Sequence, residues 1–229
     1  MKSASKNIFK QGVLASSLLL SLSLGSMVQA GVVLDNTVGG TGTLSNTLGS
    51  LTTARWNFKV FTVGTSNVQI TQQTMGLYES SSEEIARNIT FALYGVDGNN
   101  DPTGTALASD TQEVTLPGGG GSSVDFYTFN TGGTLAAYTL QAGQTYGILF
   151  SSDAPTTTLS WADMASDDIY TASEGFTFVA NKRTTNSGSS YSDNGYYNAW
   201  SMTTTGGGGG ASVPEPTSLS MIGLGAIGV

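Results

Sequence analysis

The stretch Ile89-Thr90-Phe91-Ala92-Leu93-Tyr94 decides the fold class, because Ile89, Phe91 and Leu93 alternate with the smaller Thr90 and Ala92. Successive side chains of a β-strand point to opposite faces, so such alternation places one face on a core and the other in water. The same period-two pattern recurs in two other segments, which are Trp56, Phe58 and Val60, and Phe176 and Phe178. We therefore expect half-buried β-strands at all three places.

Similar segments recur along the chain, separated by Gly, Asn, Asp and Ser. The predicted strands are Trp56–Val63, Val68–Tyr78, Ile89–Val96, Ala106–Leu116, Val124–Phe129, Leu135–Leu140, Thr145–Ser151, Thr157–Met164, Phe176–Ala180 and Tyr197–Thr203. About ten short strands with turn signals and no long helical pattern predict an all-β fold, an antiparallel β-sandwich of jelly-roll type spanning residues 31–205. A short helical turn is expected at Ser82–Arg87, where Ser82 could cap a first turn that carries Glu83 and Glu84.

The composition agrees with a β-rich domain. Only 10% of the residues are charged and 31 are glycine, whereas helices usually carry Glu, Lys and Arg on their solvent-facing side. Strands and turns use Thr, Ser, Asn and Gly there instead. Disorder is the competing interpretation, but nine Phe, nine Tyr and three Trp provide apolar anchors that disordered chains lack.

The charge balance excludes several classes of partner and site. Three of the eight basic residues, Lys2, Lys6 and Lys10, lie in the first ten positions; without them five basic residues face sixteen acidic ones, a net charge of −11. Such a surface would repel phosphate backbones and anionic lipid, so we expect no nucleic-acid partner. The chain has neither cysteine nor histidine, which rules out disulfides, thiolate nucleophiles, imidazole bases and Cys/His metal sites.

The N-terminus, residues 1–30, has the features of a secretory signal peptide. Its basic region is followed by a short apolar stretch, Val13–Leu24, and by small residues that end at Ala30. We expect a signal peptidase to cleave after Ala30. The alternative, a transmembrane anchor, would need a longer segment, because a twelve-residue helix rises only about 18 Å against a bilayer core of about 30 Å.

The C-terminus is the most specific feature. A glycine-rich linker, residues 206–212, precedes Val213-Pro214-Glu215-Pro216 and an uncharged run to Val229. This order resembles the PEP-CTERM sorting signal of Gram-negative bacteria, in which a Val-Pro-Glu-Pro motif, a transmembrane helix and a short basic tail follow one another. The resemblance implies that an integral-membrane exosortase recognises Val213, Pro214, Glu215 and Pro216, and that residues 213–229 form a transient membrane anchor.

This tail departs from the family pattern in its length. Leu219–Val229 would rise only about 16 Å as a helix, roughly half a bilayer core, and no Arg or Lys follows. We interpret the tail as truncated; a degenerate signal that does not retain the protein is the alternative. A Pro-rich spacer before a hydrophobic end is a further alternative, which the order of linker, motif and apolar run disfavours.

The middle of the chain resembles another family. Several of its segments are similar to the choice-of-anchor R domains. They are Ile89–Tyr94, the loop Gly95–Gly104, Ala106-Leu107-Ala108 and, later, Leu140–Phe150. Choice-of-anchor R domains are β-sandwich modules attached to alternative surface-anchoring tails, and the likeness covers roughly residues 35–205. It implies export and surface display and implies no enzymatic activity.

Three candidate sites use charged side chains or glycine. The loop Asp97-Gly98-Asn99-Asn100-Asp101 spaces oxygen ligands as calcium loops do, but Pro102 and Ala108 stand where an EF-hand needs Gly and Glu, so a turn-rich hairpin loop is preferred. An acidic group could supply the carboxylate pair of a glycosidase, although a solvated loop is favoured; its members are Asp163, Asp167, Asp168 and Glu174. The run Gly118–Gly121 is not followed by Lys, so it predicts a loop and no phosphate cradle.

The best binding candidate is aromatic. It consists of Tyr191, Tyr196, Tyr197 and Trp200, interleaved with Asn194, Gly195 and Asn198. Aromatic faces stack on sugar rings while amides bond hydroxyl groups, a mode that needs little charge. The alternative is that Tyr197 and Trp200 are core residues of a final strand.

The sequence therefore predicts a non-enzymatic protein of the cell surface or matrix, possessing no cofactor and binding exopolysaccharide. Without His or Cys a hydrolase would need a Ser-Lys pair, and neither Lys59 nor Lys182 lies in a recognisable Ser-x-x-Lys motif. A secreted carboxylate-based glycoside hydrolase and a calcium-stabilised adhesive module remain as alternatives.

Overall fold

Antiparallel strands make up most of the chain. The computed structural model describes residues 30–37, 45–118, 124–155, 159–164, 170–195 and 197–206. The signal peptide before Ala30 and the sorting motif Val213–Pro216 lie outside these ranges. The described strands confirm the predicted all-β class with antiparallel sheets, which pack as a sandwich.

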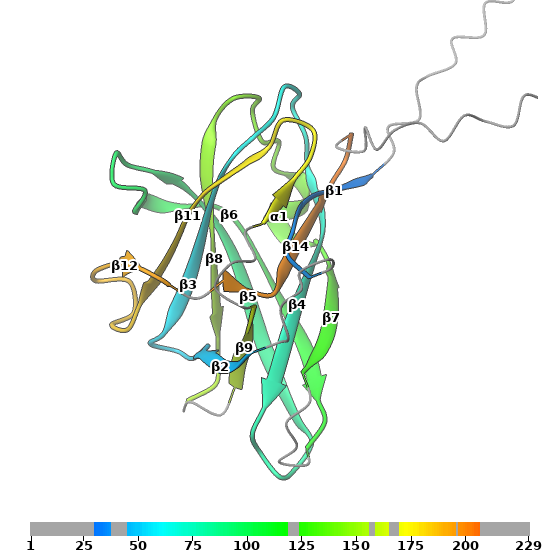
Figure 1. Ribbon diagram of the computed structural model, residues 1–229, viewed down its shortest axis with the longest axis vertical. Helices are drawn as coiled ribbons and strands as arrows, with labels where there is room; N and C mark the ends of the chain where they lie inside the picture. The colour runs from blue at the N-terminus through cyan, green and yellow to red at the C-terminus, as the bar shows by residue number, and fades with distance from the viewer. Residues whose placement is uncertain are drawn as a thin grey trace, which may run out of the picture.

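The strands form two sheets (Figure 1). The larger sheet runs in the order β10 (Thr171–Ala172), β1 (Gly31–Asp35), β14 (Trp200–Thr204), β4 (Ile70–Glu79), β9 (Leu159–Met164) and β13 (Tyr197–Asn198), with β2 (Ser45–Ser50) paired to β9 and β7 (Asp125–Asn130) paired to β4. The smaller sheet runs in the order β12 (Ser192–Asp193), β11 (Thr177–Thr184), β3 (Trp56–Thr62), β8 (Thr145–Ser152), β5 (Ile85–Val96) and β6 (Pro102–Leu116).

Aromatic rings join the two sheets in the core. The ring of Phe150 in β8 lies 4.6 Å from that of Trp161 in β9 and 5.6 Å from that of Trp200 in β14. All three side chains are fully buried. Ile89, Phe91 and Leu93 of β5 face the same core, so the alternation that predicted this strand also predicted its buried face.

Strand β3 is buried on both faces. Phe58 and Val60 lie on the outer face of the smaller sheet, in a second apolar cluster with Tyr94 and Tyr191. The segment after β11 covers this face, because the Ser187 N–H donates to the carbonyl of Ala54 and Tyr191 packs on Phe58. The sequence pattern predicted water on one side of β3; instead its other side carries Lys59 into the space between the sheets.

Two local predictions were wrong. Predicted strand Leu135–Leu140 is replaced by the single turn α1 (Gly133–Ala137), in which Leu135 is buried and Tyr138, three residues later, packs against the same core. The helical turn predicted at Ser82–Arg87 does not form, because residues from Ile85 onward pair with β6. Arg87 of β5 also forms an ion pair with the buried carboxylate of Glu79 at 3.1 Å.

The first and last described strands are neighbours. Gly31 of β1 pairs with Thr204 of β14, so the first and last described strands lie side by side (Figure 1). Within the described part of the chain, no helix is long and apolar enough to span a bilayer.

Candidate functional site

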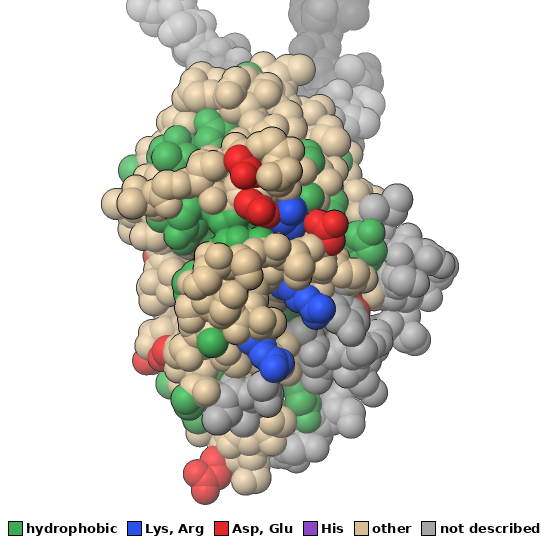
Figure 2. Space-filling view, turned by 90° about the vertical axis from the view of Figure 1, so that its left-hand side faces the viewer, with side chains coloured by type: hydrophobic (Ala, Val, Ile, Leu, Met, Phe, Trp, Pro, Cys, Tyr) green, Lys and Arg blue, Asp and Glu red, His purple; other side chains and the backbone are tan. Residues whose placement is uncertain are grey.

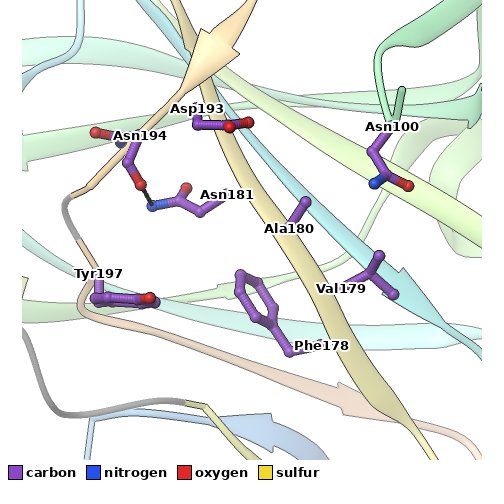
Figure 3. A pocket seen from close by; sticks show the side chains of 8 residues that line it. All are labelled: Asn100, Phe178, Val179, Ala180, Asn181, Asp193, Asn194 and Tyr197. Carbon is purple, nitrogen blue, oxygen red and sulfur yellow. Dashed lines mark hydrogen bonds between the residues drawn. The ribbon is translucent and has the colours of Figure 1, made fainter. Parts of the chain in front are cut away.

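A pocket of about 480 Å³ lies against β11 at the edge of the smaller sheet. Its lining residues are Asn100, Phe178, Val179, Ala180, Asn181, Asp193, Asn194 and Tyr197, which Figure 3 shows around the strand. The pocket combines two aromatic rings, three amides and one carboxylate. That mixture suits a ligand rich in hydroxyl groups.

The pocket exists because β11 is only partly paired on its outer edge. Strand β12 pairs with β11 at Lys182 and Arg183, and none of the described strands pairs with the preceding part of β11 on that side. A shift in register between Phe178 and Ala180 breaks the regular alternation there, and Val179 is 41% exposed. Backbone and side chains of this edge therefore face the pocket together.

Asparagine side chains fix the polar wall of the pocket. The Asn181 amide donates to the main-chain carbonyl of Asn194 at 3.1 Å, and the Asn194 amide donates to the side-chain oxygen of Asn57 at 3.0 Å. The main-chain N–H of Asn194 also donates to the carbonyl of Asn181 at 2.8 Å. These contacts hold both amides in place before any ligand arrives, which reduces the entropic cost of binding.

An ion-pair cluster closes one side of the pocket. Lys182 lies 2.8 Å from the Asp101 carboxylate and 3.6 Å from that of Asp193. Burial lowers the pKa of Lys182, but these two carboxylates outweigh burial and raise it overall. Figure 2 views the side of the molecule on which β12 lies and shows acidic and basic side chains next to each other on a face with few charges.

The loop Asp97–Asp101 is a turn, as the preferred interpretation of the sequence expected. One carboxylate oxygen of Asp97 accepts the N–H groups of Asn99 and Asp101 at 2.8 and 2.9 Å, which lowers the pKa of Asp97. Asn100 adopts a φ of 63°, a conformation that asparagine tolerates. Asp101 faces the Lys182 ammonium. Among the residues with described positions, no group of three or more acidic side chains could hold a metal ion.

The predicted aromatic residues are not brought together. Tyr197 is half-buried and lines the pocket. Trp200 is fully buried and donates its indole N–H to Gln73 at 3.0 Å, so it is a core residue, as the alternative interpretation expected, and cannot stack on a ligand. Tyr191 packs on Phe58 outside the pocket, and burial raises its pKa to about 12. Tyr196 lies outside the described residues.

The pocket also uses residues that the sequence did not single out. Phe178 was predicted only as part of a strand, and its ring lies 4.2 Å from that of Tyr170. Asn100 was considered only as part of a calcium loop. Asn181 carried no signal, because a single asparagine in a strand does not reveal which residues the fold places beside it.

A buried polar cluster lies behind the pocket, centred on Lys59. The ammonium of this fully buried side chain donates to the side-chain oxygens of Asn181 at 2.6 Å and Asn198 at 3.0 Å. It also lies 5.0 Å from the ring centre of Trp161 and 5.7 Å from that of Tyr170. Burial lowers the pKa of Lys59 well below its usual value, although the charge of Asp163 acts in the opposite direction.

Asp163 belongs to this buried cluster and does not line the pocket. Burial raises its pKa to about 6, against the opposing effects of Lys59 and of backbone N–H groups. Glu174 lies in a turn against Gly64, at a φ of 55°. Asp167 and Asp168 lie outside the described residues. Thus neither described member of the predicted acidic group faces the pocket.

Comparison with known proteins adds no relative. A scan against models of protein families finds no match to this chain, and a search of curated proteins finds no similar sequence. The resemblances to PEP-CTERM proteins and to choice-of-anchor R domains therefore stay predictions from the sequence.

Proposed function

We propose that this protein is exported by a Gram-negative bacterium and binds an exopolysaccharide at the cell surface or in the biofilm matrix, without catalysing a reaction. In this proposal a signal peptidase cleaves after Ala30, and an exosortase recognises Val213–Pro216 and processes the tail. The support for export is the order of features at the two chain ends. The proposal includes a jelly-roll-like connectivity. It is supported by the position of β1, the first strand, which lies between β10 and β14, two strands from late in the chain.

The pocket beside β11 carries the binding part of the proposal. Tyr197 and Phe178 offer ring surfaces for the apolar faces of sugars, while Asn100 offers an amide for hydroxyl groups. Asn181 and Asn194 are bonded within the protein and give the pocket a rigid polar wall. The carboxylate of Asp193 can accept further hydroxyl hydrogen bonds. A repeating polymer can be bound by several copies of the protein at once, so weak binding at each pocket is enough for attachment.

Binding to polysaccharides tests this function directly. The full chain is added to a panel of immobilised bacterial exopolysaccharides, and retention is compared with that of Tyr197→Ala. We expect the substitution to weaken binding about tenfold, because loss of one stacking ring costs roughly 1–2 kcal/mol. Phe126→Ala is the matched control, since Phe126 is a 45% exposed ring on β7 in the other sheet.

The outcome separates specific binding from general stickiness. Equal loss in Tyr197→Ala and Phe126→Ala would show that exposed rings adhere non-specifically. Absence of retention on every matrix polysaccharide would remove the glycan part of the proposal, and turnover of any of them would overturn its non-enzymatic part.

A further inference from the structure

The buried cluster around Lys59 contains more polar groups than a structural hydrogen-bond network needs. Among the described residues, two of its side-chain atoms are buried without a hydrogen-bond partner, namely Oδ1 of Asp163 and Nδ2 of Asn198. A buried polar atom without a partner is costly to the folded state. Each such atom in a folded protein needs an explanation, and a chemical role is one of them.

Lys59 has the environment of a nucleophilic amine. Its side chain is fully buried and donates hydrogen bonds to two amide oxygens, those of Asn181 and Asn198. Among the described residues, no carboxylate oxygen lies within 4.0 Å of the Lys59 side-chain nitrogen. The neutral amine, which attacks carbonyl carbons, is therefore favoured over the ammonium.

Asn198 has the environment of an electrophile. It is fully buried, and its carbonyl oxygen lies 3.0 Å from the Lys59 amine, one bond from the carbon that would be attacked. Its amide nitrogen has no hydrogen-bond partner among the described residues, so no hydrogen bond to them has to break when this nitrogen is protonated and leaves. The amide of Asn181 differs, because its nitrogen donates to the carbonyl of Asn194. Asn181 therefore positions the amine, while Asn198 can react with it.

Asp163 is placed to move the protons. It lies directly opposite Asn198 in the β9–β13 pair, so both side chains leave the same face of the sheet. Burial raises its pKa to about 6, close enough to neutral pH for this carboxyl to take up a proton and give it back. A protonated carboxyl can donate to one atom and accept from another in the same encounter.

We infer that Lys59 and Asn198 join spontaneously in an intramolecular isopeptide bond, assisted by Asp163, which links β3 of one sheet to β13 of the other. The amine lone pair of Lys59 attacks Cγ of Asn198, and the Asp163 carboxyl gives its proton to the carbonyl oxygen. The Asp163 carboxylate then takes a proton from the attacking nitrogen and passes it to the amide nitrogen. The C–N bond of the primary amide breaks, ammonia leaves, and the re-formed carbonyl returns its proton to Asp163.

The surroundings favour this bond over hydrolysis. The rings of Trp161 and Tyr170 flank the amine at 5.0 and 5.7 Å, and both side chains are buried. The Tyr170 hydroxyl donates to the main-chain carbonyl of Asn198 at 2.7 Å and fixes the backbone that carries the electrophile. A dry, positioned pair of groups reacts far faster than the same groups free in water.

Mass spectrometry of the purified full chain tests the inference. We expect a mass lower by one ammonia than that calculated from the chain termini found in the same sample. Proteolysis should yield a branched peptide pair joined at Lys59 and Asn198, with no tryptic cleavage after Lys59. Lys59→Met, which keeps an apolar stem of similar length, should restore the full mass, and Asp163→Ala should remain folded and unlinked.

A control addresses the other route to ammonia loss. Asn194 precedes Gly195, and succinimide formation there would give the same mass change without a cross-link. Ammonia loss that persists in Lys59→Met would therefore overturn the inference, as would a full mass in the folded wild-type protein. A branch at Asn181 instead of Asn198 would refute the assignment of the electrophile, and full linkage in Asp163→Ala would refute the role of Asp163.

Discussion

Replacement of Gly147 by alanine tests on which face of the smaller sheet the Phe58 side chain lies. Gly147 of β8 pairs with Val60, and a Cβ at this position would enter the ring of Phe58 on the outer face of the sheet. Overpacking of this kind costs about 1–3 kcal/mol. Alanine recovers about 0.5–1 kcal/mol through the lower flexibility of the unfolded chain, so we expect Gly147→Ala to lose about 1–2 kcal/mol net.

A double-mutant cycle isolates the contact. Phe58→Ala alone should cost about 3–5 kcal/mol, because the buried ring leaves a cavity. In the double variant the new methyl group occupies part of that cavity, so its cost should fall below the sum of the two single costs by about 1–2 kcal/mol. Urea unfolding at constant slope gives each value. Gly98→Ala is the matched control, since a Cβ there meets nothing within 4 Å.

Simple additivity in this cycle would refute the placement of Phe58. If Phe58 instead faced the inter-sheet core, Gly147→Ala would be as mild as Gly98→Ala and would not couple to Phe58→Ala. Lys59, the next residue, would then point outward, so the cycle also tests the burial on which the Lys59 cluster depends.

Two further predictions concern Asp163 and Trp200. Because the Asp163 carboxyl keeps its proton to about pH 6 in the folded protein but loses it near pH 4 when unfolded, its contribution to stability is full below pH 4 and is lost as the pH rises to about 6. We expect the wild-type protein to lose roughly 3 kcal/mol over this range relative to Asp163→Asn, measured by urea unfolding at each pH; parallel pH profiles would contradict this expectation. Trp200→Phe removes the indole hydrogen bond to Gln73 and should lower the free energy of unfolding by about 1–3 kcal/mol. Polysaccharide retention should stay unchanged. Weaker retention in the folded variant would indicate that Trp200 contacts the polysaccharide.

Alternation in the sequence revealed strands better than it revealed faces. Ile89, Phe91 and Leu93 point into the main core, whereas Phe58 and Val60, with the same pattern, point away from it. The difference arises because a distant segment around Tyr191 covers the outer face of β3, and local periodicity cannot show what a remote segment covers.

The candidate site was predictable only in part. Tyr197 was found because aromatic residues cluster near the end of the domain. Trp200 follows it by three residues and lies in the core with Asn198, since inward-facing positions in this stretch are two residues apart. The position of Lys59 between two large apolar residues predicted a solvent-facing side chain. Its burial depends on Asn181 and Asn198, which lie more than a hundred residues away in the chain.

The pairing of β1 with β14 sets an order on assembly. The partners of β1 are β10 and β14, which lie more than 130 residues later in the chain, and β14 is the last of the described strands. The backbone of β1 therefore stays unpaired with these strands until nearly the whole domain has been synthesised, and such long-range pairing slows folding. The larger sheet therefore cannot be completed until the chain has been synthesised as far as Thr204.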